Sequence, residues 1–400
     1  MIRISGIKVP EGSDMEHVRN KAARLLGIRP EEVRELTVLK SSRDARRKNS
    51  ILDVYTAAVA VENEKKVLQR ADDRNISLLE EIRYSLPVKG SGDKGSRPVI
   101  AGFGPAGIFA SLILAQEGMR PVVYERGKQA EERAADVERF FKTGVLDPDS
   151  NVQFGEGGAG SFSDGKLSTG IKDREGRKGF ILETLVRHGA DSSILTDAHP
   201  HIGTDRLIKI IPSIRREIEG LGGEIHFKTA LTGIEIKDGR LTGIRLSGED
   251  GLIRCDSLFL CLGHSARDTF FMLHDMGLAM EAKPFAVGVR AEHRREIIDG
   301  ALHREKADYK LTYHCRDGRG VYSFCMCPGG YVVNASSEEG HLTVNGMSYS
   351  GRDGINSNAA IVCTIAPGDF AGYGDDALSG VRFQRELERR TFLEAGGLVP

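Results

Sequence analysis

The chain has 400 residues, of which 40% are hydrophobic and 28% are charged, and its formal net charge is −1. This length exceeds one ordinary domain and predicts two or three, and the composition is that of a soluble globular protein. The near-zero net charge excludes a global field that would attract nucleic acid or an anionic membrane. The 48 glycines exceed the usual share of about 7% of residues, which predicts loops with left-handed backbone or close backbone approach.

The N-terminal sequence MIRISGIKVPEGSD contains no apolar core of a signal peptide. No apolar stretch approaches the ~18 residues that a membrane-spanning helix needs, so the expected location is cytoplasmic and no membrane partner is predicted. The six cysteines should then be reduced thiols. None of them belongs to a CxxC pair, and no metal site is predicted.

Residues 1–86 are predicted to form a separate α+β domain. Their pattern indicates a strand, a helix, two strands, a charged helix and a last strand near Ile76. This βαββαβ order is typical of a ferredoxin-like fold. Between the middle strands lies a basic segment containing Arg43, Arg46, Arg47 and Lys48. It favours a solvated loop over a nucleic-acid contact because it lacks interleaved aromatic residues.

The sequence changes character after this domain. Residues 87–97, PVKGSGDKGSR, have the composition of a linker. Residues 98–282 alternate short apolar strands with helices and contain an Asp238-Gly239 hairpin signal, which predicts a Rossmann-type domain with a β-meander. Residues 283–400 are irregular and β-rich, which predicts a substrate domain inserted into the α/β fold.

A glycine motif, GFGPAG, follows the strand predicted at residues 99–101. Gly102 permits a tight turn, Gly104 lets the backbone approach a pyrophosphate, and Gly107 lets the next helix pack closely on the strand. The N-terminus of that helix favours an anion. Glu125, which ends the second strand, can accept hydrogen bonds from an adenosine ribose and disfavours a 2′-phosphate. The motif therefore predicts FAD or NAD, and since no second GxGxxG exists for a nicotinamide, FAD is preferred.

A second glycine-rich segment, NVQFGEGGAGSFSDGKLSTG, covers residues 151–170. Its exposed amides, the Ser161 hydroxyl and the Lys166 cation are suited to line a pyrophosphate and the edge of a flavin as an anion-binding nest. The alternative is a flexible surface loop. The nest is preferred because Phe154 and Phe162 would anchor the segment to a core.

These motifs, together with PHIGTDRL, FLCLGHSARDTF, KPFAVGVRAEH and VYSFCMCPGGYVVNASSEEG, resemble the bacterial FAD-dependent dehydrogenases labelled NAD(FAD)-utilising, within the glutathione-reductase-like flavoprotein superfamily. The resemblance implies an α/β fold: a Rossmann-type FAD-binding domain with an inserted β-rich substrate domain, preceded by the ferredoxin-like α+β domain. It implies FAD contacts at Gly102, Gly104, Pro105, Ala106, Gly107, Glu125, Arg126, Gly157, Gly158, Gly160, Ser161 and Asp164. Gly263 and His264 resemble the strand-end motif that closes this fold beside the dinucleotide. Such flavoproteins return near their C-terminus with a further glycine-rich turn and helix, which is not found before Pro400, so a truncated form is expected.

No catalytic side chain is predicted, because a flavin carries hydride or electrons itself. Cys325 and Cys327 are interpreted as packed apolar groups rather than redox thiols. Arg290 and His293 can bind a carboxylate substrate, although a surface salt bridge is the favoured interpretation.

The predicted function is an FAD-dependent oxidoreductase acting on an unidentified small molecule, with NADH or NADPH as the candidate electron donor. One alternative is a flavoprotein that acts on or binds RNA through the basic N-terminal domain. The other is a non-enzymatic dinucleotide-binding protein. The oligomeric state is not predicted.

Overall fold

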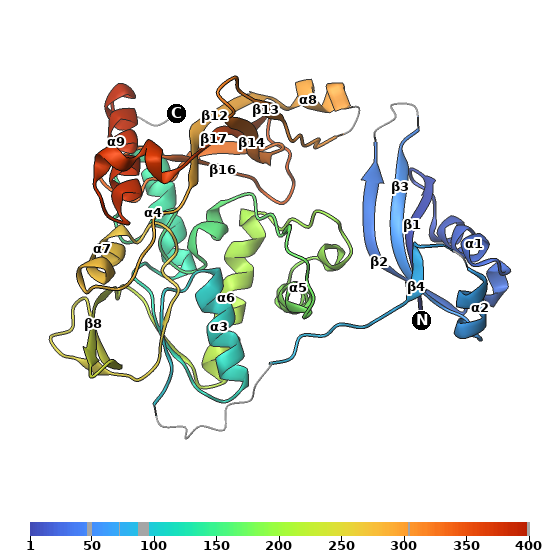
Figure 1. Cartoon of the computed structure of the whole chain (residues 1–400), viewed down its shortest axis with the longest axis horizontal. Helices are drawn as coiled ribbons and strands as arrows, with labels where there is room; N and C mark the ends of the chain where they lie inside the picture. The colour runs from blue at the N-terminus through green and yellow to red at the C-terminus, as the bar shows by residue number, and fades with distance from the viewer. Residues whose placement is uncertain (46–49, 72, 87–95, 303–304, 398–400) are drawn as a thin grey trace. The chain divides into compact units, whose positions relative to one another are not determined.

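A computed structural model describes residues 1–45, 50–71, 73–86, 96–302 and 305–397. Figure 1 shows the path of the chain. The chain divides into two compact units. The first comprises residues 1–89, 166–202 and 300–305, and the second comprises residues 90–165, 203–299 and 306–400. Residues 166–202 thus group with the N-terminal part, although they lie within the predicted Rossmann range.

The first unit contains a four-stranded antiparallel sheet in the order β2-β3-β1-β4. Its elements are β1 Ile2–Pro10, α1 Met15–Leu26, η1 Pro30–Glu32, β2 Glu35–Asp44, β3 Leu52–Ala60, α2 Glu64–Arg70 and β4 Ile76–Leu78. The side chain of Asp14 caps α1 by accepting from the His17 N–H. The βαββαβ order predicted for this part of the chain is therefore the one found.

Residues 166–202 pair with the edge of this sheet. The Ser41 N–H donates to the Thr196 carbonyl, and the Ala198 N–H donates to the Ser41 carbonyl, so the segment extends β2 at its open edge. The segment also contains α5 Arg177–Arg187 and η3 Ser192–Leu195. The rings of Tyr84 and Phe180 pack with centroids 5.2 Å apart.

The basic segment between β2 and β3 is only partly described. Arg43 pairs with Glu11 at 3.0 Å and with Asp53 at 3.5 Å, which neutralises its charge. Arg46, Arg47 and Lys48 lie outside the described residues.

The second unit is built on a parallel sheet in the order β11-β5-β6-β7. Its strands are β5 Val99–Ala101, β6 Val122–Tyr124, β7 Glu224–His226 and β11 Leu258–Leu260. The helices of this part are α3 Pro105–Gln116, α4 Ala130–Thr143, α6 Thr204–Gly220 and α7 Arg267–Asp275, with η2 Gly158–Phe162 in the second glycine segment. Helices α3 and α6 lie side by side (Figure 1). Strands β5, β6 and β7 follow one another in chain order and β11 pairs with the other side of β5, so the strand order reverses at β5, as in open α/β sheets.

A β-meander lies between the parallel strands β7 and β11 in the chain, as predicted. It consists of β8 Leu231–Lys237, β9 Arg240–Leu246 and β10 Ile253–Arg254. Asp238 and Gly239 form the turn, with φ of 51° and 74°, which is the left-handed conformation that a tight hairpin turn requires.

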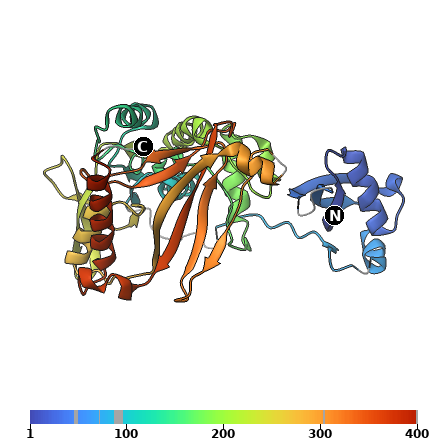
Figure 2. The same cartoon turned by 90° about the horizontal axis from the view of Figure 1, so that it is seen from above.

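The C-terminal part contains an antiparallel sheet in the order β12-β17-β14-β13 and a separate hairpin, β15-β16. The strands are β12 Phe285–Arg294, β13 Thr312–His314, β14 Gly320–Cys327, β15 Tyr331–Asn334, β16 Val344–Met347 and β17 Asn356–Ile365. Figure 2 shows the sheet in orange and α9 in red. The helical elements are α8 Arg295–Leu302, η4 Pro367–Asp369, η5 Ala371–Tyr373 and α9 Ser379–Glu394. The sequence analysis predicted no helix in this range. It missed α9 because the charged residues of that helix leave little apolar periodicity to detect.

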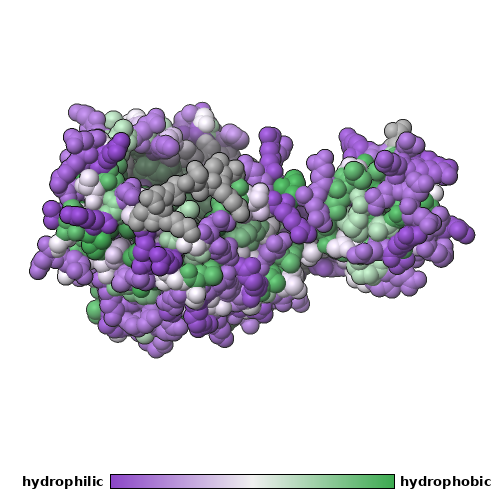
Figure 3. All heavy atoms as spheres, turned by 90° about the horizontal axis from the view of Figure 1, so that it is seen from below, coloured by the Kyte–Doolittle hydropathy of each residue, from purple (hydrophilic) through white to green (hydrophobic). Residues whose placement is uncertain are grey.

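Within the described ranges, no helix combines the length and the apolar character that crossing a membrane requires. Figure 3 shows one face of the molecule, on which hydrophilic residues predominate. The cytoplasmic location stays a prediction.

The hairpin turn gives a test of the second unit's local structure. Gly239→Val should lower the free energy of unfolding by roughly 1–2 kcal/mol, because a β-branched residue is strained at positive φ. Gly251→Val is the matched control: Gly251 is an exposed loop glycine outside the left-handed region, with open space around it. Chemical denaturation of both variants would measure the difference, and equal stabilities would contradict this account of the turn.

Candidate functional site

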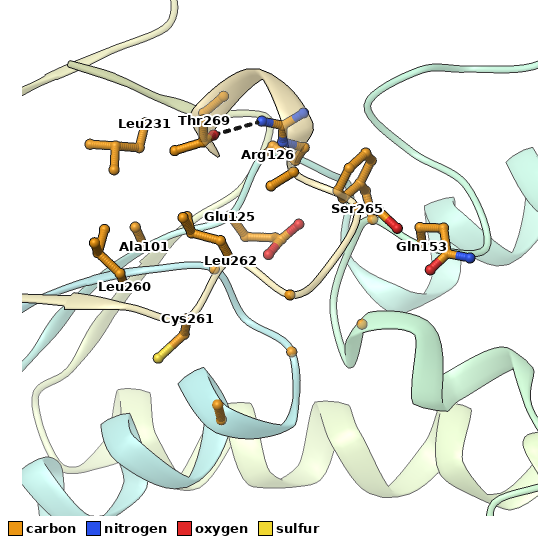
Figure 4. Close-up of a pocket in the computed structure, with 18 of the residues that line it drawn as sticks. Ala101, Glu125, Arg126, Gln153, Leu231, Leu260, Cys261, Leu262, Ser265 and Thr269 are labelled. Atoms are coloured by element: carbon orange, nitrogen blue, oxygen red, sulfur yellow. Dashed lines mark hydrogen bonds between the residues drawn. The ribbon is translucent and has the colours of Figure 1, made fainter. Parts of the chain in front are cut away.

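A cavity of about 540 Å³ opens at the carboxyl ends of the parallel strands in the second unit. Ala101 ends β5, Tyr124 ends β6 and Leu260 ends β11, and all three line the cavity. Figure 4 shows the surrounding side chains. The carboxyl ends of strands on either side of a central strand are the usual ligand site of an open α/β sheet.

The glycine motif forms one wall, and its three glycines are required for different reasons. Gly102 has φ of 100°, and a Cβ there would overlap the Cys261 carbonyl; a Cβ on Gly107 would overlap the carbonyl of Gly102. Gly104 has an ordinary φ of −76°, and the nearest atom to a Cβ built there is the Gly158 Cα at 3.7 Å. Neither backbone strain nor a protein contact therefore demands glycine at position 104. Glycine is a favoured N-cap residue, and here it also leaves the N-terminus of α3 accessible to a ligand.

Glu125 is 5% exposed and joins three loops. Its Oε2 accepts from the Phe103 N–H at 2.7 Å, and its Oε1 accepts from the N–H groups of Gly127 and Gly155, each at 2.9 Å. A carboxylate offers about four acceptor positions, so about one remains for a ribose hydroxyl. The predicted ribose contact is compatible with this arrangement, and the structure adds the anchoring of the loops.

The second glycine segment forms the facing wall, and it is held by a residue that the sequence analysis missed. Arg133 of α4 is fully buried. Its guanidinium donates to the carbonyls of Asn151, Val152, Gly155 and Glu156. Burial lowers the pKa of Arg133 to about 10, against the charges of Glu125 and Glu156, so the guanidinium remains protonated at neutral pH. These four carbonyls are therefore engaged by Arg133.

Ten of the predicted cofactor residues line the cavity. They are Gly102, Gly104, Pro105, Ala106, Glu125, Arg126, Gly158, Gly160, Gly263 and His264. The other five, all in described parts of the chain, do not line it: Gly107, Gly157, Ser161, Asp164 and Lys166.

These five have other places in the structure. Gly107 gives the close contact between helix and strand, Gly157 has a left-handed φ of 87°, and Ser161 is buried. Asp164 accepts from Arg352 at 2.6 Å and from the Ser348 hydroxyl. Lys166 groups with the first unit. For Asp164, burial in an ion pair replaces the expected cofactor contact.

Arg126 stands at the rim of the cavity. Its Nη2 donates to the Asp268 carboxylate at 2.8 Å and to the Thr269 hydroxyl at 3.4 Å, the bond drawn in Figure 4. Its guanidinium lies 4.5 Å from the ring centroid of Phe154. Arg126 thus joins the glycine segment to α7, which sequence spacing did not indicate. The lining residues that the sequence analysis missed also include Gln153, Thr229, Leu231, Cys261 and Phe270.

Helix α9 supports this wall from outside the cavity. Arg267 on α7 is 8% exposed and donates to Glu338 at 2.8 Å and to Glu388 of α9 at 2.6 Å. In the described part of α9, no residue lines the cavity. The helix therefore fixes α7 through buried ion pairs instead of contacting a ligand.

Cys325 and Cys327 are not among the residues that line the cavity. Cys327 is fully buried, and its Sγ donates to the Cys325 carbonyl at 3.3 Å. Burial on a strand agrees with the packing interpretation of this residue.

Family models match two parts of the chain. The model described as "FAD-dependent protein, C-terminal domain-like" matches residues 284–399, and a domain of unknown function matches residues 1–60. The first match supports FAD as the cofactor, as the sequence predicted.

An uncharacterized protein from Clostridium beijerinckii is 46% identical over 406 aligned positions, which cover 99% of this chain and 75% of that protein. The chain belongs to the same family as this clostridial protein.

Solved structures give more distant likenesses. L-amino acid deaminase from Proteus vulgaris is 12% identical with a TM-score of 0.28, over 66% of this chain and 63% of that one. A geranylgeranyl bacteriochlorophyll reductase-like protein from Thermoplasma acidophilum is 11% identical with a TM-score of 0.33, over 74% and 60%. A flavin-dependent brominase is 15% identical with a TM-score of 0.34, over 74% and 63%. The chain thus spans less than two thirds of the length of each structure, and such distant likenesses assign no function.

Gly107→Ala tests the close contact under the glycine turn. The added methyl group would overlap the Gly102 carbonyl, and we expect a loss of roughly 3 kcal/mol in the free energy of unfolding. Gly179→Ala, at an open position in α5, should be neutral or slightly stabilising. Denaturant titration would compare them, and a Gly107→Ala variant as stable as its control would show that the turn is placed wrongly.

His264 gives a second test. Withdrawal from water lowers the pKa of its ring, and the charge of Arg267 acts in the same direction while Glu388 opposes it. The imidazole should therefore be neutral at pH 7 and bind its second proton only below the ordinary value of about 6.5. An NMR titration, assigned with a His264→Gln variant, would check this, and a midpoint above the ordinary value would contradict it.

Proposed function

We propose that this family member is an FAD-dependent oxidoreductase acting on a small molecule, of the NAD(FAD)-utilising type within the glutathione-reductase-like superfamily. The observation that carries the proposal is Gly104. It stands open at the N-terminus of α3 where neither its backbone conformation nor any neighbouring protein atom requires glycine. A pyrophosphate bound against that backbone would use this access to the helix N-terminus.

The residues around the cavity fit this cofactor. The helix start at Gly104 would hold the pyrophosphate, and the remaining acceptor position of Glu125 would bind the ribose. The backbone at Gly158 and Gly160 would line the dinucleotide from the opposite wall. When bound, the flavin supplies hydride or electron transfer. The protein's part is to orient it, to exclude water with the apolar side chains of Leu231 and Leu262, and to keep the His264 ring neutral.

Absorbance spectroscopy tests the cofactor. Purified protein, or protein reconstituted with FAD, should show the visible bands of a bound flavin, and NADH or NADPH should bleach them if either is the electron donor. Protein that stays colourless after reconstitution would overturn the proposal.

A matched variant tests the position of the pyrophosphate. Gly104→Ala should unfold at nearly the wild-type denaturant concentration, because its Cβ would make only an ordinary van der Waals contact, with the Gly158 Cα at 3.7 Å. It should nevertheless bind FAD at least tenfold more weakly, since the methyl group would occupy the place of the diphosphate. Unchanged FAD affinity in a folded Gly104→Ala protein would contradict this placement.

A further inference from the structure

Arg290 of β12 carries a half-buried positive charge that the surrounding protein does not balance. Its Nε donates to the Asn358 Oδ1 at 2.6 Å. Its Nη2 donates to the Cys325 carbonyl at 2.7 Å and contacts the Cys327 Sγ at 3.4 Å. All three acceptors are neutral, and no carboxylate in the described ranges forms an ion pair with Arg290. The surface salt bridge favoured by the sequence analysis is therefore not found there.

Strands β14 and β16 pack closely against this guanidinium. A Cβ on Gly346 of β16 would overlap its Nη2 and the Asn358 Oδ1, so a side chain at that position would displace the guanidinium from its present place. A bulge in β14 sets Cys325 at φ of 46°, a left-handed conformation that is strained for a non-glycine residue. This bulge brings the Cys325 carbonyl to Arg290. Such a fixed position is unusual for a cation that has no counter-charge.

Asn358 supplies a second, independent observation. It is fully buried, and its Nδ2 has no hydrogen-bond partner among the described residues. An unsatisfied buried N–H is unfavourable, because it has lost its hydrogen bonds to water and gained none. Since the Oδ1 of the same amide binds Arg290, the unused donor belongs to the same cluster as the unbalanced charge.

A chain of contacts through the β15-β16 hairpin connects this cluster to the cofactor cavity. Gly346 belongs to the β15-β16 hairpin, and Met347 of that hairpin packs in one core with Val152 and Phe162 of the second glycine segment. The Gln153 Nε2 in that segment donates to the Ala335 carbonyl at 3.0 Å, and Gln153 lines the cavity. One hairpin therefore separates Arg290 from the loop beside the cofactor.

Tyr309 adds a hydroxyl near the cluster. Its oxygen lies 3.0 Å from the His293 Nε2. Burial raises the pKa of the Tyr309 phenol, and the charge of Arg290 acts in the opposite direction. Tyr309 is thus within the field of the guanidinium.

We propose that Arg290 and Asn358 form a binding site for a carboxylate, and that this carboxylate belongs to the substrate; the second statement rests on the proposed function. A carboxylate carries one negative charge, which neutralises one guanidinium. Its two coplanar oxygens match one edge of the Arg290 guanidinium together with the N–H of the Asn358 Nδ2. A phosphate dianion would require more positive charge than this cluster holds.

Acetate is the probe. Rising sodium acetate should increase the melting temperature of the flavin-bound protein saturably by a few degrees beyond the effect of sodium chloride at equal ionic strength, because it binds only the folded state. Arg290→Met should lose this response. Arg294→Met is the matched control, since Arg294 lies on the same strand with its side chain 61% exposed, and it should respond like the wild type.

Asn358→Asp decides the question if Arg290→Met folds poorly. It changes only the amide into a carboxylate, which places an internal counter-charge beside the Arg290 Nε. The variant should melt at a higher temperature than the wild type without acetate and should no longer respond to acetate. A wild type that responds to acetate no more than to chloride, or an Asn358→Asp variant that keeps the wild-type response, would overturn the site.

Visible absorbance recorded on the same samples separates the two proposals. A colourless protein with an Arg290-dependent acetate response would overturn the oxidoreductase function and its substrate assignment but leave the carboxylate site standing. A yellow protein without that response would overturn the carboxylate site alone.

Discussion

The cavity depends on the buried carboxylate of Glu125. Its two oxygens accept N–H groups from the turn after β5, from Gly127 in the loop after β6 and from the second glycine segment. Without this acceptor, three buried donors would each lack a partner at a cost of about 1–3 kcal/mol. The same carboxylate keeps about one acceptor position for a ribose. One side chain therefore holds the loops together and keeps an acceptor position free beside the cavity.

Arg133 complements Glu125 on the other side of the same loop. Glu125 accepts a hydrogen bond from an amide of the second glycine segment, and Arg133 donates hydrogen bonds to carbonyls of the same segment. With its carbonyls engaged, the segment can present amides and glycine backbone to an anion. The segment also packs against the β15-β16 hairpin, which covers Arg290. The cavity wall and the proposed carboxylate site thus contact the same hairpin.

Local patterns predicted the elements that short-range rules govern. The GxGxxG motif predicted a strand, a turn and a helix, and Asp238-Gly239 predicted a hairpin, because both need left-handed backbone or close approach that few residues tolerate. The βαββαβ order of the N-terminal part followed from periodicity. Helix α9 escaped detection because contacts distant in sequence hold it in place: Phe383 packs against Phe285, and Glu388 pairs with Arg267. Lys166, expected beside the flavin, groups with a different unit.

The sequence by itself determined the cofactor motif: which glycines turn the chain, which helix offers its N-terminus, and that an acid ends the second strand. Only the tertiary structure decided which polar groups form hydrogen bonds or ion pairs within the protein. Asp164 is bound by Arg352 and Arg133 is bound by four carbonyls, whereas Arg290 has neutral partners alone. The reason is physical: whether a charge is balanced depends on residues far away in sequence that long-range packing brings within hydrogen-bond distance.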